Sequence, residues 1–170
     1  MPMMFGLKNL GAEELVLENG KVSATTLPLD LVSSKLSYET ATFGLGWFWS
    51  SDSQFGGIKG IIRTRVGYCG GTTEKPTYRM MGDHTEAISI DYDPKVISYD
   101  QLLSYFWKVH RCERNNSKTQ YMNAVFYRNQ KQQQSALDSL RAVAKERGIS
   151  TTAIQTKIIP VKAFTYAENY

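Results

Sequence analysis

Residues 86–110 read EAISIDYDPKVISYDQLLSYFWKVH and predict a strand followed by a helix. Apolar side chains occupy every second position near the start, which is the period of a half-buried strand. Asp93-Pro94 ends this strand. Ser98, with Gln101 three residues later, forms a capping box that opens a helix. The apolar face of that helix consists of Leu102, Leu103, Phe106 and Trp107.

The flanking sequence extends this unit into a regular alternation of strands and helices. The order predicts an α+β two-layer sandwich with a split βαβ (ferredoxin-like) core and an added C-terminal helix and strand, over residues 38–170. Residues 1–37 are expected to form an N-terminal arm packed on this domain, with a hairpin at Asn19-Gly20. The other predicted elements are strands at 39–45, 58–68, 120–127 and 156–164 and helices at 47–55 and 129–147.

The composition and charge of the chain indicate a globular domain and give no sign of nucleic-acid or membrane binding. A chain of 170 residues with 42% hydrophobic and 21% charged residues fits one globular domain. A formal charge of +4, without clustered arginines, gives no reason to expect nucleic-acid binding. No apolar run approaches the roughly 20 residues that span a bilayer, so we expect a cytoplasmic protein, a monomer, with no membrane contact.

The few cysteines and histidines do not have the spacing of a metal site. Cys69 and Cys112 are the two cysteines, and neither lies in a zinc-binding motif, so no metal or cofactor is expected. His84 and His110 are expected to satisfy backbone groups rather than to bind a metal.

Short motifs follow one another along most of the chain. They are GWFW at 46–49, VGYCGG at 66–71, PTY at 76–78, HTEA at 84–87, YDP at 92–94, TQY at 119–121 and AENY at 167–170. In the types and order of these motifs, residues 38–170 resemble peptide methionine sulfoxide reductase A. That resemblance implies an α+β fold and a peptide-methionine (S)-S-oxide reductase ancestry.

The chain departs from that family at the position of the nucleophile. The family places its reactive cysteine between the glycine and the Phe-Trp pair of the first motif, and here that position is Trp47. A thiolate attacks the sulfoxide sulfur and ends as a sulfenic acid, whereas an indole offers no such nucleophile. Ordinary reduction through position 47 is therefore chemically excluded. Asn116 stands where the family has an acid, and an amide cannot exchange a proton.

The resemblance assigns the rest of the pocket to five residues. Phe48 and Trp49 would form the apolar wall for the methionine methyl group, and Tyr78, Tyr121 and Glu86 would surround the sulfoxide oxygen. Phenol hydroxyls can donate to a polarised S=O oxygen, and a carboxyl group in an apolar pocket holds its proton tightly enough to donate it. Each residue also fits an ordinary structural role, as a core aromatic, a half-buried tyrosine or a solvent-facing acid.

The prediction is a domain that has lost thiol catalysis and binds a methionine-containing peptide or a small methionine-like ligand. Two alternatives remain open. Trp47 would fill the cavity if the domain is only an interaction scaffold. A relocated thiol, Cys69 or Cys112, would preserve reductase chemistry, with Arg111 and Arg114 lowering the pKa of Cys112. Trp47 would also be explained by a misread selenocysteine codon or an introduced change.

Overall fold

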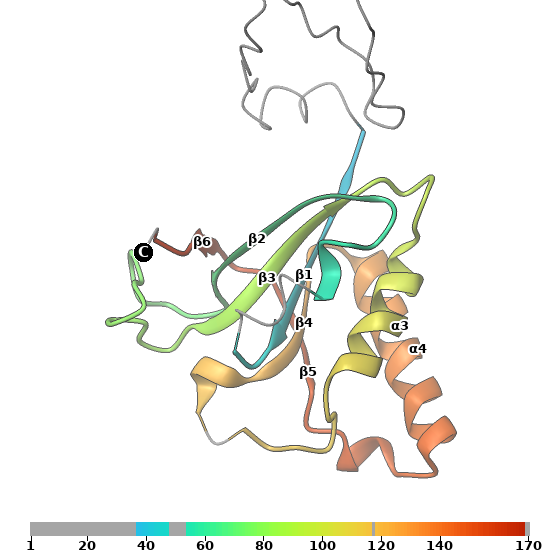
Figure 1. The fold of residues 1–170 in the computed structure, drawn as a ribbon. Coiled ribbons are helices and arrows are strands. Elements are labelled where there is room, and N and C mark those ends of the chain that lie inside the picture. The colour runs from blue at the N-terminus through green and yellow to red at the C-terminus, as the bar shows by residue number, and fades with distance from the viewer. Residues whose placement is uncertain (1–36, 48–53, 117, 169–170) are drawn as a thin grey trace, which may run out of the picture. The chain divides into compact units, whose positions relative to one another are not determined.

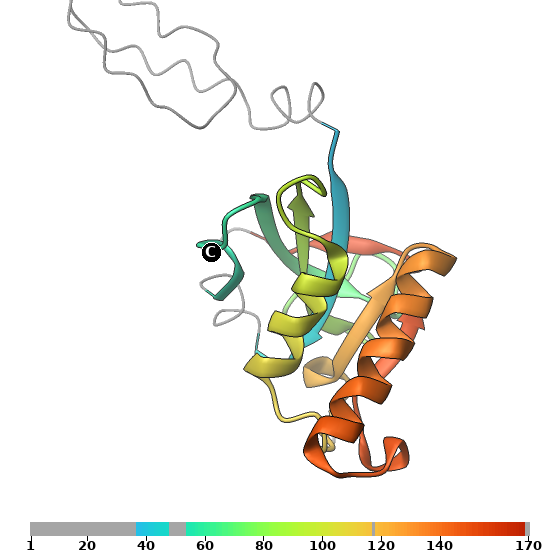
Figure 2. The same ribbon diagram turned by 90° about the vertical axis from the view of Figure 1, so that its right-hand side faces the viewer.

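Six strands form one mixed sheet in the part of the chain that the computed structural model describes, residues 37–47, 54–116 and 118–168 (Figure 1). Both long helices lie side by side on one face of this sheet (Figure 2). In chain order the elements are β1 (Glu39–Leu45), β2 (Ile61–Cys69), β3 (Thr85–Tyr92), α3 (Tyr99–Val109), the 3-10 turn η1 (Thr119–Tyr121), β4 (Asn123–Tyr127), α4 (Gln130–Arg147), the 3-10 turn η2 (Thr151–Ala153), β5 (Lys157–Pro160) and β6 (Phe164–Tyr166).

The strand order confirms the predicted α+β class. The sheet runs β5-β4-β1-β3-β2-β6, and its four central strands, β4-β1-β3-β2, pair antiparallel as in a split βαβ core. The strand β6 adds antiparallel to β2, and β5 adds parallel to β4. No helix among the described residues is long and apolar enough to cross a membrane.

Aromatic rings fill the layer between the sheet and the helices. The ring of Phe43, on β1, is fully buried and lies 4.8 Å from the ring of Phe106 on α3, measured between centroids. Trp107 donates a hydrogen bond from its indole nitrogen to Ser139 at 2.9 Å, which joins α3 to α4. Truncating a buried phenylalanine to alanine costs about 3–5 kcal/mol, so Phe43 is a principal stabilising residue of this layer.

Local capping fixes the ends of both helices. Ser98 and Gln101 exchange the two predicted hydrogen bonds at the start of α3, and the capping box is confirmed. Asn129 caps α4 by accepting a hydrogen bond from the backbone of Gln132. The helix ends at Gly148, whose φ of 65° is the left-handed conformation that glycine adopts without strain.

The predicted single strand 156–164 is wrong. Two short strands replace it: β5 ends at Pro160, and β6 starts at Phe164 on the other edge of the sheet. The connection 161–163 can reach about 14 Å, whereas a flat sheet of six strands is about 24 Å wide. The sheet is therefore strongly curled, so that its edges approach each other. A second apolar cluster of Cys69, Ala87, Ala124 and Phe126 packs against the face opposite the helices.

Other boundaries differ less from the prediction. The predicted strand 120–127 begins with the turn η1, and β4 itself starts at Asn123. The predicted strand 58–68 starts three residues later than expected, at Ile61. Most of the predicted helix 47–55 and nearly all of the arm 1–37 lie outside the described residues, so both stay predictions.

Candidate functional site

Glu86 is a fully buried carboxylate on β3. It lies opposite Tyr68 of β2 in the antiparallel register, two residues before Ile88 and therefore on the same, helix-facing side of the sheet. Gln120 donates a hydrogen bond from its side-chain amide to Oε1 of Glu86 at 2.8 Å. A buried carboxylate is costly unless it is hydrogen-bonded, and the bond from Gln120 both offsets that cost and holds the carboxylate in one position.

Tyr121 connects Glu86 to Tyr78. The hydroxyl of Tyr121 shares a hydrogen bond with the side chain of Tyr78, and Glu86 lies close enough to act on it electrostatically. Loss of hydration, the bond to Tyr78 and the negative charge of Glu86 together raise the pKa of Tyr121, so its phenol stays protonated at neutral pH. The structure thus brings together three of the residues that the sequence singled out. We call Tyr78, Glu86 and Tyr121 the polar cradle.

Glu168 holds Tyr78 in place from the other end of the chain. Its carboxylate accepts a hydrogen bond from the backbone N–H of Tyr78 at 2.8 Å and a second from the hydroxyl of Tyr68 at 2.9 Å. No role is predicted for Glu168 or Gln120 from the sequence alone. Their positions within the motifs AENY and TQY are the sequence signal that indicates them.

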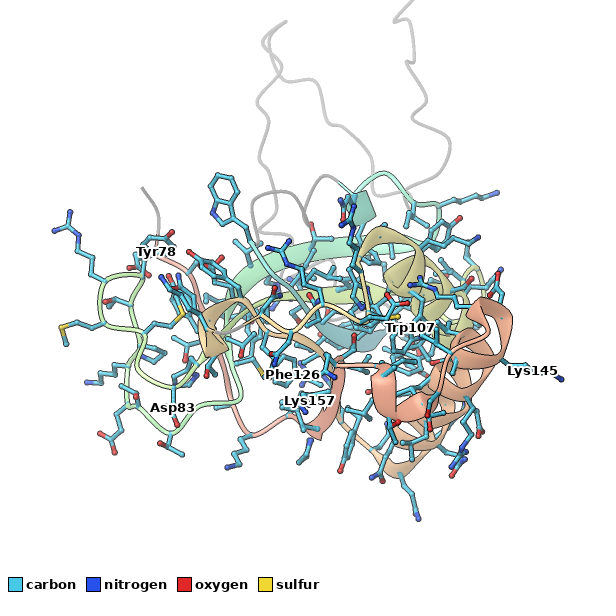
Figure 3. The ribbon with its side chains drawn as sticks, turned by 90° about the horizontal axis from the view of Figure 1, so that it is seen from below. Tyr78, Asp83, Trp107, Phe126, Lys145 and Lys157 are labelled. Atoms are coloured by element: carbon cyan, nitrogen blue, oxygen red, sulfur yellow. The ribbon has the colours of Figure 1, made fainter. Side chains whose placement is uncertain are left out.

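The segment between β2 and β3 carries Tyr78 and Asp83 (Figure 3), and hydrogen bonds from its own side chains fix its shape. Asp83 accepts hydrogen bonds from the backbone N–H groups of Thr72 and Thr73, and these bonds lower its pKa. His84 accepts from the N–H of Gly71 through Nδ1, so its Nε2–H donates to the carbonyl of Thr73 at 2.9 Å. His84 therefore satisfies backbone groups, as predicted.

A cleft of about 870 Å³ lies beside the cradle. Its walls come from the end of β1, the last turn of α3 and the chain leading to η1, and they include Trp47, Asn116 and Tyr121. The side chain of Trp47 is 59% exposed, so it forms part of the cleft wall and is not a core residue. Tyr121 belongs to both the cradle and the cleft and joins them.

Close backbone approaches place these residues together. Gly46 has a φ of 80°, a conformation that favours glycine, at the turn that presents Trp47. At Gly44 a side chain would meet the carbonyl oxygen of Met122 at 2.7 Å, so β1 passes directly against the end of η1.

Asn116 donates a hydrogen bond from its side-chain amide to the backbone carbonyl of Tyr121. In this structure Asn116 therefore positions Tyr121. Phe48 and Trp49 lie outside the described residues, and their place in the wall stays a prediction.

Both cysteines are fully buried. Cys69 packs in the apolar cluster with Phe126, on the sheet face opposite the helices, and burial raises its pKa to about 11. The sulfur of Cys112 accepts a hydrogen bond from Arg147 at 3.1 Å, yet burial outweighs that positive charge and raises its pKa. The expected lowering of the Cys112 pKa by Arg111 and Arg114 is therefore wrong, because the arginine that acts on the sulfur is Arg147 and burial has the larger effect. Neither cysteine is among the described residues that line the cleft.

His110 ends α3 as a buried, hydrogen-bonded ring. Its Nδ1–H donates to the carbonyl of Phe106 at 2.6 Å, and Nε2 lies 2.9 Å from the hydroxyl of Thr156. Burial lowers the pKa of His110, so the ring is neutral at physiological pH. Among the described residues, no group of three or more His, Cys, Asp and Glu side chains is arranged to hold a metal ion.

The fold and the cradle together define a class: an α+β sandwich with two tyrosines and a buried acid beside the turn that ends β1. The family model for peptide methionine sulfoxide reductase matches residues 39–170, and the chain belongs to that family.

Similar proteins and structures agree with this membership. A peptide methionine sulfoxide reductase of Drosophila melanogaster is 43% identical over 134 residues, which cover 77% of this chain and 54% of the fly protein. The MsrA of Methanosarcina acetivorans is 40% identical over 141 residues, 78% of this chain and 74% of that protein. The chain thus spans about half the length of the fly relative.

Two solved structures have the same fold. Reduced Mxr1 from Saccharomyces cerevisiae superimposes with a TM-score of 0.71 at 25% identity, over 78% of this chain and 81% of that chain. Methionine sulfoxide reductase A of Corynebacterium diphtheriae gives a TM-score of 0.68 at 27% identity, over 77% and 70% of the two chains.

Proposed function

We propose that this domain binds the side chain of methionine sulfoxide or methionine in a peptide, and that it does not reduce the sulfoxide through position 47. The observation that carries the proposal is the polar cradle of Tyr78, Glu86 and Tyr121, assembled beside a cleft whose wall holds an indole at Trp47. Membership in the methionine sulfoxide reductase family supports the class of ligand.

The cradle has the chemistry to recognise a sulfoxide oxygen. A protonated phenol is a hydrogen-bond donor, and the phenol of Tyr121 is protonated at neutral pH, because its pKa lies above the ordinary value of 10. Tyr78 supplies a second hydroxyl, held at its backbone by Glu168. The exposed ring of Trp47 can contact the thioether and methyl group, and such sulfur–aromatic contacts are worth about 0.3–1.5 kcal/mol. Phe48 and Trp49 would complete the apolar wall.

Reduction needs a group that the described cleft lacks. Converting a sulfoxide to a thioether takes two electrons and two protons, and in thiol chemistry the electrons come from a sulfur that attacks the substrate sulfur. An indole at position 47 cannot form that bond. The cradle can still bind and polarise the oxygen, because those functions need only donors and an acid.

A second candidate is a thiol-dependent reductase that uses Cys69 or Cys112, and membership in the family favours it. Burial of both sulfurs and their raised pKa values argue against it, since a nucleophile must reach the substrate as a thiolate.

The test combines binding with turnover. The chain is titrated with matched peptides that carry methionine-S-sulfoxide, methionine-R-sulfoxide, methionine or norleucine, and binding is measured by calorimetry. The same sulfoxide peptides are then incubated with the protein and dithiothreitol, and the product is followed by mass spectrometry. We expect a methionine compound to bind more tightly than norleucine, with no reduction.

Two results would overturn the proposal. If the norleucine peptide binds with the same affinity as the methionine and methionine sulfoxide peptides, the cradle does not recognise the sulfur group. Reduction by the wild-type chain that disappears in Cys69→Ser or in Cys112→Ser would establish the relocated-thiol enzyme instead.

A further inference from the structure

Four cationic side chains line the cleft beside Trp47. Lys108 comes from the last turn of α3, and Arg111, Arg114 and Lys118 come from the chain that leads to η1. All four are exposed, and none forms an ion pair with another residue that the structure describes. The described residues that line the cleft include neither aspartate nor glutamate. Among the residues that the structure describes, the cleft walls therefore carry positive charge with no acidic side chain to neutralise it.

Hydrogen bonds from Gln155 and Arg147 fix the backbone near these cationic residues. Gln155 donates from its backbone N–H to the carbonyl of Cys112 at 2.8 Å, and Arg147 donates to the carbonyl of Trp107 at 2.9 Å. The N–H of Arg114 closes a turn on the carbonyl of Arg111 at 3.1 Å. These bonds fix the backbone at Trp107, Cys112 and Arg114, which limits the entropic cost of binding at those residues.

We infer that the cleft binds the acidic residues that flank the bound methionine, so that the ligand is a methionine within an acidic peptide segment. This inference rests on the proposed function, because Tyr121 links the cleft to the polar cradle. A volume of about 870 Å³ exceeds what one side chain fills and suits a ligand of several groups. Carboxylates placed there meet unpaired cations, and each such pair adds to affinity and to the association rate.

The shape of the site favours a short peptide over a nucleic acid. Nucleic-acid binding needs a basic track that follows many phosphates, with bases stacked along it. Here the cations gather around one cleft, and the formal charge of the whole chain is only +4.

The test compares peptides that differ only in the charge beside the methionine. Each peptide carries a central methionine sulfoxide, flanked by glutamates, glutamines or lysines, and dissociation constants are measured by fluorescence anisotropy. We expect the acidic peptide to bind about tenfold more tightly than the neutral one at low ionic strength. At about 0.5 M salt the preference falls to about twofold or less, because exposed charges are screened.

Charge-matched variants locate the effect. Arg111→Gln with Arg114→Gln removes two charges from the cleft, and Lys131→Gln with Lys145→Gln removes two from exposed positions on α4. We expect the first pair to abolish the preference for the acidic peptide and the second pair to keep it. Circular dichroism confirms that both variants fold.

The outcomes separate this inference from the proposed function. Equal affinity for acidic and neutral sulfoxide peptides, or equal loss in both double variants, overturns the inference and leaves the proposed function standing. An acidic norleucine peptide that binds as tightly as the sulfoxide peptide supports the basic cleft and overturns the methionine function. A single-stranded oligonucleotide that binds more tightly than the acidic peptide, through Arg111 and Arg114, overturns the peptide assignment.

Discussion

Gln120 donates a hydrogen bond to the buried carboxylate of Glu86 at 2.8 Å, and the next residue, Tyr121, places its hydroxyl beside the same acid. One short 3-10 turn, η1, therefore supplies both the partner that satisfies the acid and a donor for a ligand. Asn116 fixes the same turn through the carbonyl of Tyr121. The polar cradle thus depends on this turn at three of its contacts.

The first prediction concerns the bond between Gln120 and Glu86. Gln120→Ala removes a donor from a buried acid, and an acid that loses such a partner costs about 1–3 kcal/mol of folding free energy. We expect the free energy of unfolding, measured by urea denaturation, to fall by about that amount. Gln134→Ala is the control, since Gln134 bonds to the exposed Asp138 and its loss should cost less than about 0.5 kcal/mol. Equal unfolding midpoints for the two variants would contradict the role given to Gln120.

The second prediction concerns the residue at the turn. Trp47→Cys puts a thiol beside Tyr121 at the cleft, where sulfur chemistry becomes possible. We expect dithiothreitol-dependent reduction of a methionine-S-sulfoxide peptide at a rate about a hundredfold or more above the wild-type background.

Trp47→Ser serves as the control for this gain, because it removes the indole without supplying a thiol. If Trp47→Ser and Trp47→Cys reduce the peptide equally, the nucleophile does not stand at position 47. If neither variant nor the wild type binds the peptide at all, the cleft is not the ligand site.

Local sequence signals located the central elements well. The strand 39–45 has its predicted bounds, and the helix after Ser98 begins where the capping box placed it, because both depend on neighbours within four residues. The predicted strand 156–164 failed for the opposite reason. Its break at Pro160 follows from the curling of the whole sheet, which no short window contains.

In the candidate site too, local motifs predict some residues, whereas others depend on contacts between distant parts of the chain. Tyr78, Glu86 and Tyr121 were found because they stand in recognisable motifs, and the structure brings them together. The supporting residue Glu168 reaches Tyr68, 100 positions earlier in the chain, so its role depends on the tertiary fold. The charged partner of Cys112 is Arg147, 35 residues away, and no local sequence signal indicates that contact.

The third prediction concerns thiol reactivity. With a pKa of about 11, Cys69 is ionised in roughly one molecule in a thousand at pH 8, and burial shields both sulfurs. We expect the native chain to react with Ellman's reagent far more slowly than a free thiol, and both cysteines to react at once in denaturant. Rapid reaction of one thiol in the native chain, traced by mass spectrometry to Cys112, would favour the relocated nucleophile.

The last prediction concerns pH and His110. Burial lowers its folded-state pKa below the ordinary value of 6.5, with a smaller contribution in the same direction from Arg147, while the bond to Phe106 and the charge of Glu113 oppose the shift. The unfolded state therefore binds the proton more readily than the folded state does. The stability contributed by neutral His110 is complete above about pH 6.5 and declines as the pH falls from there toward the folded pKa.

A variant that does not titrate isolates this effect. His110→Gln retains hydrogen-bonding groups, so the difference in unfolding free energy between the wild type and this variant should shrink as the pH is lowered from about 7.5 to about 5, by about 1.4 kcal/mol for each unit by which the folded pKa is lowered. Urea denaturation across that pH range measures the difference, in which the other titrating groups cancel. Parallel curves for the two proteins would mean that His110 keeps an ordinary pKa in the folded chain, and that its ring is not protected from water by the contacts with Phe106 and Thr156.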